Sequence, residues 1–381
     1  MSKPIILARS PYLVDVDETG SIGSEVQLFI WNGTGSAPGT PTYKLSKKTA
    51  RPTETRTEYD IAPYVRDFLR ANYTQTNSID YSTPVSDYNS DFWCNVLVKY
   101  YNTTTAGTEY LGETNFYAFD GYLNSRDDFS LNGDPTLAGE PIVMYSNSGS
   151  INVPDQLATS FFTVYAQSPV IVNGNGCYYQ VQGSEDIETI HTDNPTTFIL
   201  ITALENNTIN VYNSEDEIIY TFTVTRKCLP KYRPILLDFV NRFGVWQKCW
   251  FFGADYESIN ATSDNYKLMQ NVVTYPNYQY FNYNYKQGQT FNRNGVKTFK
   301  VNTDWVDEQW NVCLEEIMMS ENLILSYYIN VQGFSDTSSF KYSYPVKLNT
   351  NSIQLNRHIN EKLINYTLEF EYLSPIVNNI I

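Results

Sequence analysis

Histidine, cysteine and positive charge are all scarce in this chain of 381 residues. It has two histidines, five cysteines and 26 lysines and arginines against 41 acidic residues, so its formal net charge is −15. A strongly acidic surface repels phosphate backbones, which argues against sequence-specific nucleic-acid binding. One role near nucleic acid stays open, an acidic channel through which DNA slides without adhering.

The cysteines lie far apart and form no CxxC pair. They are Cys94, Cys177, Cys228, Cys249 and Cys313. An odd number at wide spacing is not typical of a disulfide framework or of a structural zinc site. We therefore interpret them as small buried hydrophobic residues in a reducing compartment, and we expect neither a metal nor a cofactor.

Long hydrophobic runs are also missing. No stretch approaches the ~18 consecutive apolar residues that a membrane span needs. The first residues, MSKPIILARSPYLV, contain only a short apolar run that Arg9 interrupts, which is not typical of a signal peptide. We expect a soluble protein made in the cytoplasm, with no membrane partner.

No common catalytic or ligand-binding motif is present. The sequence contains no GxxxxGK[ST], GxGxxG or HExxH, and neither His191 nor His358 has the setting of a hydrolase triad. Asp15–Gly20 resembles the start of a calcium loop, but its twelfth position is Val26, so we interpret it as a charged turn between two strands. The acidic run from Glu185 to Asp193 is typical of a solvated loop. These observations predict a protein that is not an enzyme.

Aromatic residues, by contrast, are abundant, at 15% of the chain with 32 tyrosines. Short β-type runs separated by Gly, Pro, Asn and Ser fill most of the sequence. They predict a mainly β protein of two or three β-sandwich-like modules, with one short helix in the first module and one longer helix in the last. The predicted divisions are an N-terminal domain (1–123), a linker (124–139), a middle all-β domain (140–229) and a C-terminal domain (230–381).

In the N-terminal domain, the run Glu25–Trp31 alternates apolar and polar residues, as a half-buried strand does. Asp60 precedes a short helix as a candidate N-cap, with Pro63 in its first turn. The runs Phe92–Tyr101 and Glu109–Phe119 predict a hairpin closed over Asn102–Gly107. Further predicted strands are Ile5–Ala8, Tyr12–Val16 and Tyr43–Leu45.

The later domains contain further predicted strands. In the middle domain these are Phe161–Tyr165, Cys177–Gln182, Thr197–Thr202, Thr208–Tyr212 and Ile218–Thr225. In the C-terminal domain they are Ile235–Val240, Val245–Phe252, Tyr256–Asn260, Ser338–Tyr344, Ile353–His358 and Lys362–Tyr372. The runs Ile235–Val240 and Val245–Phe252 are joined by the turn Asn241–Gly244.

A strand–helix–strand unit over 297–331 organises the C-terminal domain. The sequence predicts a helix over 304–319, with Asp304 as its N-cap and acidic residues in its first turn. Val306, Trp310, Cys313 and Ile317 form one apolar stripe at helical spacing, bounded by polar residues. We expect this stripe to lie on a sheet.

The Tyr/Asn-rich arm over 275–294 is the most promising interaction surface in the sequence. Tyrosine offers a large, stiff contact area, which suits protein interfaces and sugar stacking alike. An ordinary aromatic hairpin packed on its own sheet is the competing interpretation. The C-terminal tail, apolar from Ser374 onward, is expected to dock on its own domain or on a neighbouring subunit. The candidate interface residues are Tyr275, Tyr278, Tyr280, Phe281, Tyr283, Tyr285, Ile376, Ile380 and Ile381.

Six stretches follow one another in a characteristic order. They are ARSPYLV, FIW, YDIAPYVRDFL, FVNRFGVWQKCWFFG, VNTDWVDEQWNVCLEEIMMSENLIL and EKLINYTLEFEYLSPI. In texture and order the chain resembles virion proteins of tailed bacteriophages that infect Bacteroidota, the crAss-like phages among them. The resemblance covers most of the chain but includes no residue set known to do chemistry, so it implies no catalytic positions.

The resemblance implies a tail, collar or baseplate component that forms rings of identical subunits around the DNA channel. We therefore expect a non-enzymatic structural subunit of a phage tail, located in the virion. Its expected partners are copies of itself in a ring and other tail, portal or collar proteins. The alternative is a receptor- or glycan-binding tail fibre or adhesin. A glycan-degrading tail enzyme is a third possibility, which requires a pair of carboxylates in a cleft.

Overall fold

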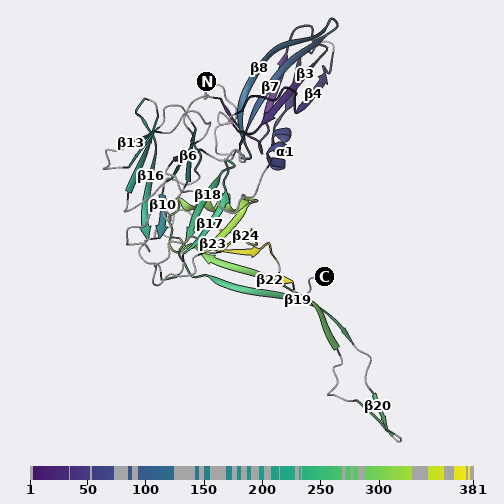
Figure 1. Ribbon diagram of the computed structural model, residues 1–381, viewed down its shortest axis with the longest axis vertical. Coiled ribbons are helices and arrows are strands. Elements are labelled where there is room, and N and C mark those ends of the chain that lie inside the picture. Colours follow the sequence, from purple (N-terminus) through teal and green to yellow (C-terminus); the bar gives the residue numbers. More distant parts are fainter. Residues whose placement is uncertain are drawn as a thin grey trace.

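The computed structural model of the chain is mainly β, with many strands and two helices among the residues it describes (Figure 1). The described residues are 3–33, 35–51, 54–72, 85–87, 93–123, 142–145, 150–154, 169–173, 178–181, 187–189, 197–200, 207–213, 215–227, 231–232, 234–267, 272–275, 278–281, 288–327, 342–355, 364–374 and 376–377. The mainly β prediction is confirmed, but the second helix is not the longer one as predicted, since it has 10 residues and the first has 11. The predicted linker over 124–139 lies outside the described residues.

The N-terminal part contains a five-stranded sheet in the order β1-β8-β7-β3-β4. Its strands are β1 (Ile5–Leu7), β3 (Gly23–Trp31), β4 (Tyr43–Lys48), β7 (Trp93–Thr104) and β8 (Gly107–Phe119). All neighbours are antiparallel except β1 and β8, which are parallel. The predicted hairpin is confirmed, but its strands extend further than predicted, because Thr104 pairs directly with Gly107.

A second layer covers one face of this sheet. It consists of the strand pair β2 (Leu13–Asp17) and β5 (Arg56–Asp60) and the helix α1 (Ala62–Asn72). The core between the layers contains Val14, Val16 and Tyr59 from the second layer and Val26, Leu28, Val96 and Val98 from the sheet. The predicted cap is confirmed, since the Oδ1 atom of Asp60 accepts hydrogen bonds from the backbone N–H groups of Ala62 (3.1 Å) and Tyr12 (3.2 Å).

Because Asp60 serves both the helix start and the neighbouring loop, Asp60→Ala is expected to lower the free energy of unfolding by about 1 to 2 kcal/mol. Urea unfolding followed by circular dichroism checks this value. Asp67→Ala, on the same helix but not at a cap, is the matched control and is expected to change stability by less than about 0.5 kcal/mol. Equal effects of the two substitutions would contradict the capping role.

Two further sheets form the middle part. The five-stranded sheet has the order β10-β16-β15-β12-β13 and the four-stranded sheet the order β6-β14-β11-β9. Their strands are β6 (Val85–Asp87), β9 (Ile142–Val143), β10 (Ser150–Pro154), β11 (Pro169–Asn173), β12 (Tyr178–Val181), β13 (Ile187–Thr189), β14 (Thr197–Leu200), β15 (Asn207–Tyr212) and β16 (Ile218–Lys227). The predicted strand Phe161–Tyr165 lies outside the described residues, as do His191 and His358.

The C-terminal part is built on an eight-stranded sheet whose main path runs β18-β17-β23-β24-β25-β22-β19, with β26 also paired to β22. The strands are β17 (Ile235–Val240), β18 (Trp246–Phe251), β19 (Tyr256–Lys267), β22 (Gly288–Asn302), β23 (Leu323–Tyr327), β24 (Tyr342–Leu348), β25 (Thr367–Tyr372) and β26 (Ile376–Val377). Two predictions need correction. Residues 353–355 are not in a strand, and the last long strand begins at Thr367 rather than at Lys362.

Helix α2 (Trp310–Met319) begins later than predicted. Asp304 is not its N-cap, because Asp304 adopts a positive φ of 60° and Val306 pairs with Ile364 through two backbone hydrogen bonds of 2.8 Å. This pairing holds the segment before the helix extended. Gln309 stands at the N-cap without a side-chain capping bond.

The apolar stripe of α2 is confirmed. Val306, Trp310, Cys313 and Ile317 are all buried in the core over the large sheet, although Val306 lies before the helix. The Trp310 ring meets the Phe251 ring edge to face at 5.7 Å. Asn311, one of the polar residues beside the stripe, is also buried and accepts a 2.6 Å hydrogen bond from the Tyr366 hydroxyl.

The N-terminal and C-terminal parts meet at a hydrophobic junction. It consists of Ile5, Leu7, Trp93, Phe119, Met144, Val240, Phe243, Val245, Trp246 and Ile324. The two backbones touch here, because a Cβ built on Gly244 would lie 2.7 Å and 2.8 Å from backbone atoms of Asp120 and Gly121. Gly244 also has a φ of 82°, which favours glycine.

A network of ion pairs lies beside the junction. Arg9 binds Asp120 through two hydrogen bonds of 3.0 and 2.8 Å, and Glu321 receives Arg70 at 2.7 Å. Arg66 lies 3.6 Å from both carboxylates. Burial lowers the pKa of Arg9, but its bond to Asp120 and the nearby carboxylates outweigh burial and raise that pKa. The network therefore connects Arg66 and Arg70 of α1 with Glu321, which lies just after α2.

Candidate functional site

A long β-hairpin leaves the body of the protein and forms its most distinctive surface. Strands β19 and β22 pair from Tyr256 and Lys300 out to Lys267 and Gly288, with one irregularity after Thr262. Figure 1 shows this hairpin running away from the sheets toward the end marked by β20. From here on we call the whole hairpin from Tyr256 to Asn302 the arm; it is longer than the segment 275–294 that the sequence predicts. The short strand pair β20 (Val272–Tyr275) and β21 (Tyr278–Phe281) belongs to the same outward-pointing region.

Only the base of the arm packs on the core. Thr298, Phe299 and Val301 are buried, and β25 pairs with β22 over Thr298–Asn302. From Gly288 to Asn294 every side chain whose burial is described is exposed, and all of β19 is exposed along both faces. A two-stranded ribbon without a core is only marginally stable by itself in water. The arm therefore gains little stability from contacts within its own chain, and its exposed surface is available for contact with another molecule.

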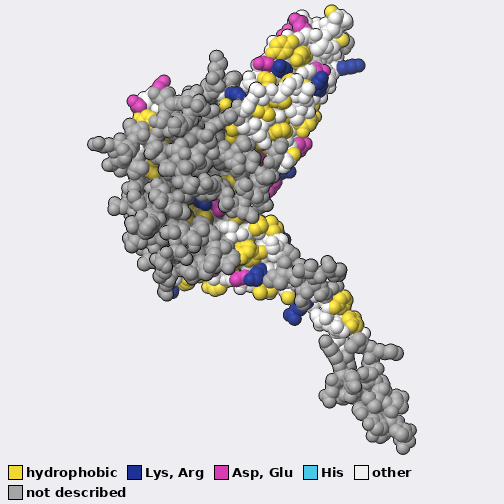
Figure 2. Space-filling view, in the orientation of Figure 1, with side chains coloured by type: hydrophobic (Ala, Val, Ile, Leu, Met, Phe, Trp, Pro, Cys, Tyr) yellow, Lys and Arg dark blue, Asp and Glu magenta, His cyan; other side chains and the backbone are white. Residues whose placement is uncertain are grey.

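Several large apolar side chains are exposed on the arm. Tyr256 and Ile259 are 68% and 60% exposed, and the rings of Tyr266 and Phe291 meet at 5.6 Å while both remain exposed. Figure 2 shows hydrophobic side chains near the base of the arm and further along it. Exposed aromatic residues of this kind are characteristic anchors of protein interfaces.

The predicted interface residues fall partly in this region. Tyr275 pairs with Tyr278 at the end of the β20–β21 hairpin, and Tyr280 and Phe281 lie on the same strand β21. Tyr283 and Tyr285 lie outside the described residues. Within the described part of the arm, the sequence prediction did not include Tyr256, Ile259, Tyr266 and Phe291. The sequence YESINATSDNYK could have indicated these residues, because it is an unusually long strand with little hydrophobic alternation, as expected of a strand that is not buried.

The C-terminal tail docks in part on its own chain. Ile376 and Val377 form β26, which pairs with Gly295 and Asn294 at the base of the arm. Ile380 and Ile381 lie outside the described residues. The tail thus follows β22 up to the point where the arm becomes a two-stranded ribbon.

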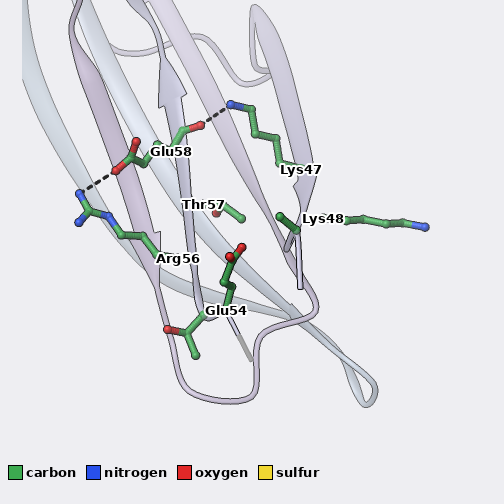
Figure 3. A pocket seen from close by; sticks show the side chains of 8 residues that line it. Lys47, Lys48, Glu54, Arg56, Thr57 and Glu58 are labelled. Atoms are coloured by element: carbon green, nitrogen blue, oxygen red, sulfur yellow. Dashed lines mark hydrogen bonds and ion pairs between the residues drawn. The ribbon is translucent and has the colours of Figure 1, made fainter. Parts of the chain in front are cut away.

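A polar pocket of about 550 Å³ lies at the far end of the N-terminal part (Figure 3). Its charged side chains come from β4, β5 and the loop between them, and they include Lys47, Lys48, Glu54, Arg56 and Glu58. Arg56 pairs with Glu58 at 3.0 Å, and the Lys47 ammonium donates to the backbone carbonyl of Glu58. Figure 3 shows Lys48 directed away from Thr57 and Glu58, toward the outside.

The residues considered for metal binding have structural roles where they are described. Asp15 pairs with Arg56 at 3.3 Å, and Asp17 accepts a 2.6 Å hydrogen bond from Thr55, so the segment is a strand end with a charged turn. In the described part of the chain, no three His, Cys, Asp or Glu side chains gather as a metal site. Neither described helix has the length and hydrophobicity to span a bilayer.

Three cysteines are described, Cys94, Cys249 and Cys313, and all three are buried, as expected. The sulfur atoms of Cys249 and Cys313 lie 3.8 Å apart between β18 and α2. Burial raises the pKa of Cys249 well above the usual value of a thiol. Cys249 therefore stays protonated, and both side chains pack as small apolar groups.

No protein-family model matches the chain, and no curated protein matches its sequence. Among solved structures, the chain is similar to the periplasmic chaperone SfaE, with 9% identity over 59% of this chain and 97% of the other, at a TM-score of 0.17. It is also similar to fibronectin(III)-like modules of CbhA from Clostridium thermocellum, with 10% identity over 60% of this chain and 90% of the other, at a TM-score of 0.17.

A further similarity is to dimeric latent PorU from Porphyromonas gingivalis, with 8% identity over 79% of this chain and 31% of the other, at a TM-score of 0.18. At these TM-scores the similarities carry no argument about the fold or the function of this chain.

Proposed function

We propose that the protein is a non-enzymatic structural subunit of a phage tail, a ring, collar or baseplate component that joins its neighbours through the arm. In this proposal its N-terminal and C-terminal parts act as β-sandwich-like modules, and the virion is its place of action. The resemblance to phage virion proteins, given by the ordered sequence stretches, supports the tail setting.

The observation that carries the proposal is the exposure of the arm. Its β19 strand is exposed from Tyr256 to Lys267, and Tyr256, Ile259, Tyr266 and Phe291 offer apolar surface to solvent. Selection for stability of the single chain does not account for a solvated ribbon with exposed aromatic rings, since such a ribbon buries little. A contact with another subunit does account for it.

The rigid junction between the N-terminal and C-terminal parts supports the same proposal. A ring closes only if each subunit presents its two contact surfaces at a fixed angle. The buried junction around Trp246 and Phe119, together with the bidentate Arg9–Asp120 pair, packs the two parts against each other.

The mass of the purified full-length chain tests the proposal. Mass photometry over nanomolar to micromolar concentrations is expected to show a closed assembly of more than three copies. A compact trimer would favour the tail fibre or adhesin instead. A monomer at every concentration, measured also by sedimentation at higher concentration, would contradict the proposal.

A further inference from the structure

The five-stranded N-terminal sheet and the eight-stranded C-terminal sheet have four outer strands between them, and the chain itself covers two of the four. The outer strands are β1 and β4 in the N-terminal sheet and β18 and β19 in the C-terminal sheet. Strands β1 and β18 are covered, because Ile5, Leu7 and Trp246 are buried together at the junction. Within the described part of the chain, β4 and β19 each pair with a neighbour on one side only.

The open edges β4 and β19 lie at opposite ends of the molecule (Figure 1). An open edge presents unpaired backbone N–H and C=O groups, which readily accept another strand. Natural proteins usually blunt long open edges, so a fully exposed 12-residue edge strand such as β19 indicates a use for it.

The two edges carry opposite charge. Strand β4 has Lys44, Lys47 and Lys48 within six residues and no acidic residue. Strand β19 has Glu257, which pairs with Lys297 of β22 at 2.6 Å, and Asp264, with one lysine at its end. Two β4 edges repel each other, and lysines on an edge deter most partners, whereas a strand with carboxylates is a suitable complement.

We propose that β19 of one copy adds to the β4 edge of the next copy, which extends the N-terminal sheet by a strand of the neighbouring arm. This inference rests on the proposed ring function and identifies the contact between neighbouring subunits of the ring. The pairing joins two different surfaces, so it is head-to-tail and can close into a ring. The six residues of β4 can pair over their whole length with half of β19.

The surroundings of both edges suit this contact. The exposed Tyr266 lies on the outer half of β19 with the Phe291 ring beside it, and the exposed Ile22 precedes Gly23, which pairs with the end of β4. The pocket of Figure 3 lies where β4 ends, and its Lys48 side chain is directed outward. An arriving carboxylate can pair with that ammonium group.

Pairing of β19 with β19 of a second copy is the competing arrangement. It would be symmetric, so it would close at two copies and build no ring. It would also bring two acidic strands together, which like-charge repulsion disfavours. The experiment below separates the two arrangements.

Cysteine cross-linking between two singly substituted chains tests the proposal. One chain carries Ser46→Cys on β4, and a second set of chains carries a single cysteine at each position from Ser258 to Asn265 in turn. The chains are mixed, assembled and mildly oxidised, and linked peptides are identified by mass spectrometry, which separates new links from any that involve native cysteines. We expect a β4–β19 link in mixtures at a defined register, and no link in either chain alone.

Charge reversal supplies a second readout on the same assembly. Lys44→Glu with Lys48→Glu is expected to lower the yield of the linked product about tenfold. Lys231→Glu, an exposed lysine in the segment between the middle and C-terminal parts, is the control and is expected to leave the yield unchanged.

The possible failures are distinguishable. Rings without any β4–β19 link would overturn this inference and leave the proposed function standing. Links between two β19 cysteines in an unmixed sample would overturn it in favour of the symmetric pairing. Monomers at all concentrations would overturn both the inference and the proposed function.

Discussion

A chain in which residues 263–293 are replaced by Asn-Gly is expected to stay monomeric at concentrations where the full chain assembles. Thr262 and Asn294 are paired, so a two-residue turn can close the shortened hairpin between them. The deletion removes the exposed Tyr266–Phe291 pair but leaves the buried Phe299 and Val301 and the pairing with β25 in place. Mass photometry measures the loss of assembly, and thermal melting measures the stability of the body, which is expected to stay unchanged.

Point substitutions on the arm separate a specific contact from a general effect of shortening. Tyr266→Ser with Phe291→Ser is expected to weaken assembly by about 4 kcal/mol, roughly a thousand-fold, because each aromatic anchor contributes about 2 kcal/mol. The matched control is Tyr178→Ser with Tyr212→Ser, which removes a stacked ring pair (4.7 Å) from the middle sheet. If both pairs weaken assembly equally, or if the shortened chain assembles as the full chain does, the arm is not the contact.

Gly244→Ala is expected to destabilise the protein far more than Gly20→Ala. Both glycines have similar positive φ angles, 82° and 78°, so both substitutions carry the same backbone cost of about 1 to 2 kcal/mol. A Cβ on Gly20 would meet no atom within 4 Å, whereas a Cβ on Gly244 would collide with the backbone of Asp120 and Gly121. Overpacking against rigid backbone adds about 1 to 3 kcal/mol, so we expect about 3 kcal/mol or more for Gly244→Ala.

Chemical denaturation of both variants beside the unchanged chain gives the two free energies of unfolding. The difference between them measures how tightly the N-terminal and C-terminal parts are joined, since the backbone conformation is the same at both positions. Equal destabilisation by the two substitutions would mean that the parts can separate slightly at the junction without cost. A rigid ring subunit would then need another source of stiffness.

Local sequence patterns predicted most of the strands in the N-terminal and C-terminal parts. The runs Glu25–Trp31 and Ile235–Val240 have the hydrophobic content of buried strands, and the turn at Asn241–Gly244 contains a glycine where the backbone needs a positive φ. The cap at Asp60 was also visible, because a carboxylate two residues before Ala62 is a strong local signal.

Features set by distant contacts could not be predicted in the same way. Asp304 has the composition of an N-cap, but the pairing of Val306 with Ile364, 58 residues later in the chain, delays the helix. The parallel pairs β1–β8 and β10–β16 likewise join strands that are far apart in sequence. Neither local propensity nor alternation reports such pairings.

The candidate site was predicted by region but not by residue. The Tyr/Asn-rich composition pointed to 275–294, a range that contains the exposed Phe291, whereas the exposed Tyr256, Ile259 and Tyr266 lie before it. Composition reveals where aromatic residues are frequent, but exposure depends on whether a neighbouring element covers them. The edge position of β19 in the large sheet, which leaves them uncovered, is a property of the sheet order.

Electron microscopy of the purified, assembled chain gives the most direct test of what the arm does. Our account predicts class averages of closed rings in which each arm reaches the N-terminal part of the adjacent subunit and is covered by it. Particles whose arms extend freely into solvent, while other surfaces make the contacts between subunits, would contradict it.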